Sequence, residues 1–364
     1  MMDLLKMLCS LSGASGYEDD VRDYIETRAR PFADTVETDA MGNLIVFKKG
    51  KMTPKRTLML CAHMDEVGVI ITGINGDGYL NFDFLGGVDR RVVIGKTVYV
   101  RSKLGGRVPG VFGLKPVHLS EKSEGIPKLD SMYIDIGTST KEDAEKLVAL
   151  GDDGVFSPDI VEFGEGLIKA KALDDRLGCA VLLKLIESDL PCDCRFVFTV
   201  QEEVGARGAA VAAYRLRPDI ALVVEGTTAA DLPDVPYDKQ ICQPGNGVVI
   251  PYMDRGALYD RTLWTVLADL ADSDNLPRQT KRQIAGGTDA QTIQRSGVGV
   301  RTVGIAAAIR NIHSPSSIAN VADIEGVLTL SRLFLQAVAD GTVDAAIEGS
   351  SFPKAAEIAD DSNE

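Results

Sequence analysis

Histidine and carboxylate side chains recur in this 364-residue sequence at the ends of apolar, strand-like runs. The runs and the residues that follow them are 58–62 with His63 and Asp65, 196–200 with Glu202 and Glu203, 220–224 with Glu225, and 298–305 with His313. In open α/β sheets, ligands bind outside the carboxyl ends of the strands. The sequence therefore predicts that these side chains gather at one edge of a sheet.

The residue types in this set suit a site for two divalent metal ions. Imidazole and carboxylate groups together bind zinc, cobalt or manganese. Paired sites hold their ions about 3.5–4 Å apart, need a bridging carboxylate, and polarise a water molecule and a scissile carbonyl. Asp174 and Asp175, at the start of a predicted helix, add two more carboxylates.

The spacing within two of these segments sets geometric conditions. His63 and Asp65 are two residues apart, so they face the same side of an extended chain. The Asp65 carboxylate is then placed to accept a hydrogen bond from the nitrogen of His63 that does not bind metal. Glu202 and Glu203 are adjacent and face opposite sides of a regular strand. Both can serve one site only if the strand ends there and the chain turns.

Each of these pieces also has a purely structural interpretation. Acidic residues after a strand are common helix caps, and Asp174 and Asp175 can cap a helix predicted at 175–188. The glutamate pair can belong to a solvated loop, and His118 is most simply a structural or surface residue. Two of the three histidines in the chain stand beside the predicted strands, however, and this favours the metal site.

The elements that hold these residues alternate between helix and strand, which is typical of an α/β protein. The run 57–62 has no polar alternation, as expected for a strand covered on both faces. Between residues 67 and 160, short β-rich pieces separated by Gly, Asn and Asp turns indicate an inserted all-β unit. After it, helices are predicted at 175–188, 208–215, 258–270 and 323–339, and strands at 195–200, 220–224 and 298–305. The acidic residues 355–364 are expected to form a frayed tail.

Composition excludes several classes of protein. With 45% hydrophobic and 25% charged residues, the chain is typical of a globular protein that buries a core. A net charge of −14 argues against a nucleic-acid partner, and no apolar run approaches the ~20 residues of a membrane-spanning helix. Six scattered cysteines are not a disulfide scaffold, and Asp3 and Lys6 interrupt the apolar N-terminus. We therefore predict a cytoplasmic protein.

Six segments together resemble the glutamyl aminopeptidase/cellulase-M-like family of dinuclear metallo-aminopeptidases, which includes the tetrahedral aminopeptidases. They are Ala62-His63-Met-Asp65-Glu-Val-Gly, Ala172-Leu-Asp174-Asp175-Arg-Leu-Gly, Gln201-Glu202-Glu203-Val-Gly, Glu225-Gly-Thr-Thr, Gly286-Gly-Thr-Asp289-Ala and His313-Ser-Pro. They occur in the family's order, and the resemblance extends from about residue 4 to residue 339.

The resemblance implies a role for each site residue. Asp174 bridges two metal ions, His63 and Glu225 complete the ligands of one ion, Glu203 and His313 complete those of the other, Glu202 is the general base, and Asp65 orients His63. The peptide bond between Asp174 and Asp175 is expected to be cis. Many members carry Asp where this chain has Glu225, and the extra methylene can alter metal preference or occupancy.

The resemblance also implies the fold, the activity and the partners. We expect an α/β fold whose mixed, largely parallel central sheet is flanked by helices, with an inserted small β-barrel-like domain. A catalytic domain would span 1–66 and 163–345, a dimerisation domain 67–162, and an acidic tail 346–364. The expected activity is metal-dependent release of N-terminal residues from peptides, with two zinc or cobalt ions, or manganese, in each subunit. Dimers would assemble into a tetrahedral dodecamer. Independently of the resemblance, residues 286–289 are expected to form a wall of the substrate pocket, which is built from loops.

Two alternative functions stay open at this point. A glycosidase needs two acidic residues flanking a sugar bond, but it leaves His63 and His313 without a role. The chain also has one Trp and 6% aromatic residues, few for a cleft that stacks sugars. A non-catalytic metal-binding relative is the second alternative, and the complete ligand set together with Glu202 argues against it.

Overall fold

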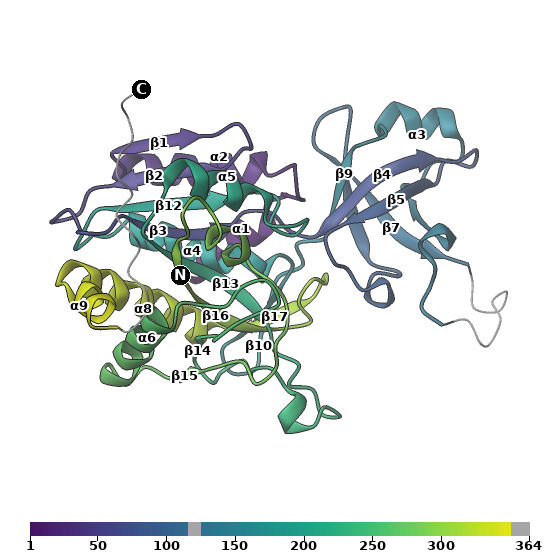
Figure 1. The fold of residues 1–364 in the computed structure, drawn as a ribbon. Coiled ribbons are helices and arrows are strands. Elements are labelled where there is room, and N and C mark those ends of the chain that lie inside the picture. Colours follow the sequence, from purple (N-terminus) through teal and green to yellow (C-terminus); the bar gives the residue numbers. More distant parts are fainter. Residues whose placement is uncertain (116–124, 351–364) are drawn as a thin grey trace.

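The computed structural model describes residues 1–115 and 125–350. They form a large mixed sheet with its helices and a smaller barrel, which stand side by side (Figure 1). The sheet has eleven strands, and the barrel is closed by six. This arrangement confirms the predicted α/β fold with an inserted β-barrel.

Nine strands of the large sheet follow one another in space. In spatial order they are β1 (Thr35–Thr38), β2 (Leu44–Lys48), β12 (Cys194–Thr199), β3 (Leu58–His63), β13 (Ile220–Thr228), β16 (Arg301–Arg310), β17 (Ser317–Asn320), β11 (Leu167–Ala170) and β10 (Val161–Phe163). Two short strands, β14 (Val248–Val249) and β15 (Arg278–Gln279), pair beside β16. The four central strands, β12, β3, β13 and β16, are parallel, and the flanking pairs are antiparallel.

Side chains of the central strands alternate between two apolar layers. Leu58 and Leu60 of β3 belong to a core with the helices of one face, whereas Met59 and Cys61 pack into the core on the other. The whole strand is buried. The unbroken apolar run at 57–62 thus has the physical cause that the sequence suggests, since both faces of the strand are covered.

Helices cover both faces of the large sheet. The first core contains residues of α1 (Met2–Ser10), α2 (Asp19–Ala29), α4 (Leu173–Ile186), α6 (Arg261–Ser273), α8 (Val321–Ala339) and α9 (Thr342–Gly349). The second contains residues of α5 (Arg207–Leu216) and α7 (Ala290–Ile293). The described residues hold no helix with both the length and the apolar content needed to cross a membrane.

The inserted unit is a closed antiparallel barrel with its own core. Its strands, in order around the barrel, are β4 (Gly68–Ile74), β5 (Leu80–Leu85), β8 (Met132–Asp135), β7 (Arg107–Leu114), β6 (Thr97–Arg101) and β9 (Asp153–Phe156), and α3 (Lys141–Leu147) lies beside them. Phe82, Phe112 and Phe156 fill its centre with edge-to-face and tilted contacts. The barrel buries apolar area on the inside of every strand, which stabilises the insertion as a separate unit.

The predicted tail begins too early. Residues 342–349 form α9, and Val343 and Ile347 of this helix are buried in the first core. Their apolar spacing outweighs the acidic composition that suggested a tail from residue 346. The frayed end predicted at 355–364 and His118 both lie outside the described residues.

Candidate metal centre

The parallel strands bring the predicted ligands to one edge of the sheet. His63 is the last residue of β3 and pairs in register with Thr199, the last residue of β12. Glu225 lies inside β13, beside Ala306 of β16, and is not beyond the strand's end as the sequence suggests. β13 is longer than its apolar run because Gly226 and the two threonines after it continue the pairing with β16.

His63, Asp174 and Glu225 form the first cluster. The Nε2 atom of His63 lies 3.3 Å from Asp174 Oδ1 and 3.2 Å from Glu225 Oε1. All three side chains are buried or nearly so. One ligand atom from each lies within 4.8 Å of the others, a spacing at which a single metal ion can bind all three.

Asp174, Glu203 and His313 form the second cluster. The Nε2 atom of His313 lies 3.4 Å from Asp174 Oδ2 and 3.2 Å from Glu203 Oε2. Asp174 thus turns one oxygen toward each histidine, which is the geometry of a carboxylate shared by two ions. The Nδ1 atom of His313 lies 3.0 Å from the carbonyl oxygen of Gly87, a contact that fixes the ring.

The backbone at the start of α4 directs the side chains of Asp174 and Asp175 toward different partners. Their peptide bond is cis, as expected, and both residues have non-helical φ and ψ angles. Asp175 accepts hydrogen bonds from the backbone N–H groups of Gly178 and His63, so it caps α4 and holds the end of β3. Asp174 faces the histidines instead. The capping interpretation is therefore right for Asp175, whereas Asp174 contributes to both clusters.

A tight turn after β12 allows both glutamates to face the site. The strand ends at Thr199, and Gln201 has a left-handed φ of 55°. The Asp65 carboxylate accepts the N–H groups of Glu202 at 2.9 Å and Glu203 at 3.1 Å. The chain thus turns where the sequence analysis requires it to turn.

Asp65 approaches the His63 ring with both its backbone carbonyl and its carboxylate. The Nδ1 atom of His63 lies 3.0 Å from the Asp65 carbonyl oxygen and 3.4 Å from the carboxylate. Besides the two glutamate N–H groups, the carboxylate accepts the Ser15 hydroxyl at 2.6 Å. Ser15 is a residue that sequence reasoning missed, because it lies 50 positions away with no motif to mark it.

Burial and charge strongly perturb the acid–base groups of the two clusters. Burial raises the pKa of Glu203 to about 7, although His313 opposes it, and raises the pKa values of Glu202 and Glu225 well above the usual range. Burial alone would lower the pKa of His313, but Asp174 and Glu203 raise it to about 9. Carboxylates outnumber imidazoles here, so the site attracts cations.

The donor set fits divalent metal ions. Two imidazole nitrogens and the oxygens of three carboxylates converge, without a thiolate, and this chemistry suits zinc, cobalt or manganese. The described cysteines are all buried and free, and neither cluster includes one. The pair at 192 and 194 lies at the start of β12.

A cavity of about 650 Å³ elsewhere in the molecule holds none of these residues and lies at the opposite ends of the parallel strands. The cavity beside the clusters measures about 320 Å³. Residues of both clusters line it, as do Glu202, Lys281 and Gly286–Thr288. The predicted wall at 286–289 is thus next to the site, except that Asp289 turns inward to accept the Thr199 hydroxyl.

A mixed α/β sheet that holds two carboxylate–imidazole clusters at its strand ends is the architecture of a candidate metallohydrolase. The M42 glutamyl aminopeptidase family matches residues 42–330 of this chain. The chain therefore belongs to the M42 family of aminopeptidases.

Individual relatives cover almost the whole chain. A protein of Acetivibrio thermocellus named "Putative aminopeptidase" is 38% identical over 334 residues, 91% of this chain and 97% of the relative. The structure of aminopeptidase APDkam598 from Desulfurococcus kamchatkensis has a TM-score of 0.90 and 34% identity, covering 96% of this chain and 98% of that one. TET1 peptidase of Pyrococcus horikoshii has a TM-score of 0.82 and 32% identity over 92% and 98% of the two chains, and it assembles into a tetrahedron or a large octahedral shell.

Proposed function

We propose that this aminopeptidase is metal-dependent and uses two divalent ions, with Glu202 as general base. The observation that carries the proposal is the position of Asp174, whose two oxygens lie 3.3 and 3.4 Å from the histidines of two separate clusters. His63 and Glu225 would hold one ion, and Glu203 and His313 the other. Bound ions would supply Lewis acidity for a water molecule and for the scissile carbonyl.

The protein side chains account for the proton transfers. Glu202 lines the cavity beside both clusters, and burial raises the pKa of its carboxyl well above the usual range. Its place beside both clusters would let the Glu202 carboxylate take the proton of the attacking water. It then returns that proton to the leaving amine. The Asp65 carboxylate accepts the backbone N–H of Glu202 and so holds this residue in place.

Removal of metal tests this proposal directly. Peptide hydrolysis should be lost after dialysis against a chelator and should return when zinc, cobalt or manganese is added to the apoenzyme. Metal analysis should find two ions per chain in the active form. Hydrolysis of a glucan that survives chelation would instead support the glycosidase alternative, and binding of metal without hydrolysis of any peptide would support the non-catalytic one.

Lys281 suggests which peptides the site prefers. Its side chain lines the cavity, and its Nζ donates to the Ala285 carbonyl oxygen at 3.1 Å. Among the described residues, no carboxylate forms an ion pair with it. Burial lowers the pKa of Lys281, although Asp254, Glu225 and Asp174 oppose this effect. A substrate carboxylate bound directly to the ammonium would further reduce the cost of burying it. The proposal therefore includes preference for peptides that begin with Glu or Asp, tested with a panel of aminoacyl reporter substrates.

The proposal also covers assembly and location. The family resemblance and the shells of the Pyrococcus horikoshii peptidase support a homo-oligomer, with the barrel as the dimerisation domain. A tetrahedral dodecamer in the cytoplasm remains the predicted form. Mass measurement in solution tests it.

A further inference from the structure

Behind the metal centre lies a second group of charged side chains, Glu66, Lys171 and Arg176, called here the Glu66 cluster. Lys171 Nζ lies 2.5 Å from Glu66 Oε1, and Arg176 Nη2 lies 3.1 Å from the same oxygen. The three residues are at most 1% exposed. Two buried cations thus share one carboxylate oxygen.

The cluster joins segments that lie far apart in the sequence. Lys171 also donates to the carbonyl oxygen of Leu11 at 2.7 Å, and Arg176 donates to that of Leu8 at 2.5 Å. The Nε atom of Arg176 donates to the carbonyl oxygen of Met64 at 2.9 Å. These bonds tie the end of α1 and the start of α4 to the segment that follows β3.

Two of the joined segments carry the metal ligands. Met64 separates His63 from Asp65, while Lys171 and Arg176 stand three residues before and two residues after Asp174. Between them, Ala172 has a left-handed φ of 54°, which is unfavourable for a residue with a Cβ. The cluster therefore holds both sides of the segment that presents Asp174.

Burying the charged side chains of the Glu66 cluster costs free energy that burying apolar side chains in the same place would not cost. Burying two cations against one carboxylate carries a desolvation penalty, and apolar residues of similar volume are often at least as stabilising. What the charges add is directional bonding to three backbone carbonyls on two separate segments, the end of α1 and the residue after β3. That kind of bonding fixes positions to fractions of an ångström, which a metal site requires.

We propose that Glu66, Lys171 and Arg176 are positioning residues that set the placement of His63 relative to Asp174 and so determine metal affinity and turnover. This proposal rests on the proposed metal-dependent function. None of the three residues lines the cavity of about 320 Å³ that would hold substrate, although Glu66 borders a small cavity with Asp174, Glu203 and His313. Their hydrogen bonds go to backbone carbonyls, so their effect on His63 and Asp174 passes through the backbone.

The test uses Lys171→Met and Arg176→Lys in the full chain. Lys171→Met keeps the volume and removes one cation, whereas Arg176→Lys keeps the charge but cannot reach Glu66, Met64 and Leu8 together. Apoprotein is titrated with Co²⁺ alone, followed by visible absorption, and unfolding in denaturant is measured for each variant. Both variants should bind Co²⁺ at least tenfold more weakly, with kcat reduced more than KM is raised at saturating metal.

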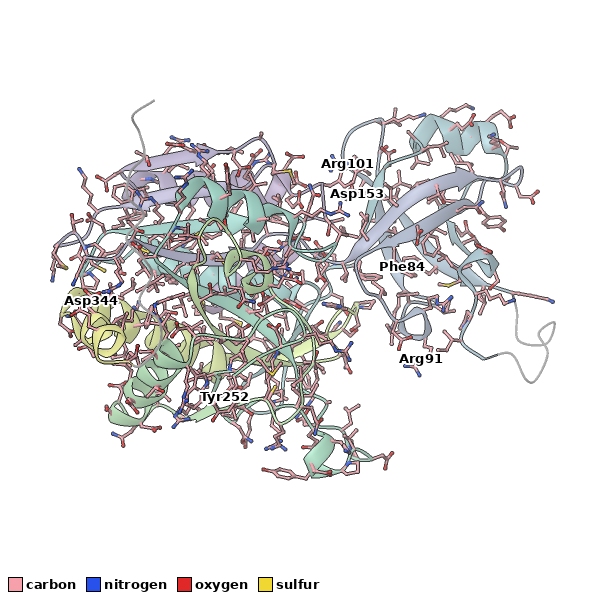
Figure 2. The ribbon with its side chains drawn as sticks, in the orientation of Figure 1. Phe84, Arg91, Arg101, Asp153, Tyr252 and Asp344 are labelled. Carbon is pink, nitrogen blue, oxygen red and sulfur yellow. The ribbon has the colours of Figure 1, made fainter. Side chains whose placement is uncertain are left out.

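Arg107→Met is the matched control. Arg107 and Arg101 share the fully buried carboxylate of Asp153 in the barrel, and their own side chains are more exposed than those of the Glu66 cluster. Arg101 and Asp153 lie beside each other at the side of the barrel nearer the larger domain (Figure 2). This variant should lose stability but bind Co²⁺ as the wild type does. The proposal is overturned if Co²⁺ affinity and kcat of both cluster variants stay within twofold of wild type, if Arg107→Met weakens Co²⁺ binding equally, or if both cluster variants simply fail to fold. Failure of the wild type to bind Co²⁺ would instead overturn the proposed function.

Discussion

At the scale of single residues, the two adjacent glutamates should have separable roles. Glu202→Gln should keep both metal ions and lose about 100-fold to 10,000-fold in kcat, because only the proton acceptor is removed. Glu203→Gln should instead lose metal at the cluster that contains His313. Metal content and kcat, measured on the same samples, distinguish the two. Near wild-type turnover in Glu202→Gln would exclude it as general base.

Lys281 provides the corresponding prediction for substrate choice. Lys281→Glu should lower kcat/KM for a substrate that begins with Glu by about 10-fold to 100-fold, since a charged hydrogen bond is replaced by repulsion. For substrates that begin with Lys, kcat/KM should instead rise in Lys281→Glu. Lys281→Met serves as the neutral control and should flatten the preference. An unchanged ratio of the two kcat/KM values in Lys281→Glu would remove Lys281 from the specificity pocket.

Glu18 is not one of the proposed metal ligands, and it leads to a prediction about how stability depends on pH. Burial raises the pKa of this carboxyl to about 7, above the usual value near 4.5, although it accepts N–H groups of Gly16 and Gln201. A raised acid pKa means that stability is fully present below pH 4.5 and is lost as the pH rises through 7. Glu18→Gln should therefore be more stable than wild type at pH 8 by on the order of 1–3 kcal/mol.

Denaturant unfolding of the apoproteins at pH 5 and pH 8 measures this effect. The difference between Glu18→Gln and wild type should shrink toward zero at pH 5, where the wild-type carboxyl is protonated in the folded state. An equal difference at both pH values would show that the substitution acts through packing and not through charge.

At the scale of elements, the sequence predicts long buried strands and helices better than short ones. The apolar runs of β3, β12 and β13 are unbroken because two layers cover them, so their location and the carboxylate or imidazole that follows can be read directly. The edge strand β1 and the two-residue strands β14 and β15 have no such pattern. Their pairing is set by neighbours that are distant in the sequence.

The same limit applies to the site. The strand ends place His63 and Glu203, but the contact of Ser15 with Asp65 and the approach of Lys281 to the cavity depend on loops. Loop positions follow from tertiary packing, and a lone Ser or Lys carries no periodic signal. The loop residues of the site therefore could not be named before the structure, whereas the residues of the two carboxylate–imidazole clusters could.

Gly178 in α4 shows how closely an element must fit its site. A Cβ at this position would lie 2.3 Å from Asp175 Oδ2, the oxygen that holds the backbone N–H of His63. Gly178→Ala should therefore lower the free energy of unfolding by about 1–3 kcal/mol and weaken metal binding. Gly349→Ala, in α9 with nothing within 4 Å of its Cβ, should leave both unchanged. Metal binding equal to wild type in Gly178→Ala would show that α4 can shift without moving His63.

At the scale of the whole molecule, the barrel stands beside the larger domain (Figure 1). Several of its apolar residues are exposed. Val92 is 39% exposed and Val111 is 45% exposed, and their segments are joined by a backbone bond from Gly95 to Phe112. Exposed apolar residues that gather on one surface can mark an interface between proteins. We therefore expect this part of the barrel to contact a second copy of the chain.

Val111→Glu should then reduce the mass of the assembly in solution, because a charge at the interface would be buried without a partner. Val298→Glu is the matched control, since Val298 is 78% exposed on the larger domain and lies away from the barrel. Light scattering coupled to size-exclusion chromatography measures the mass, and kcat per chain shows whether each subunit still works alone. If Val111→Glu keeps the wild-type mass while Val298→Glu reduces it, the subunits associate through the larger domain and the barrel has another role.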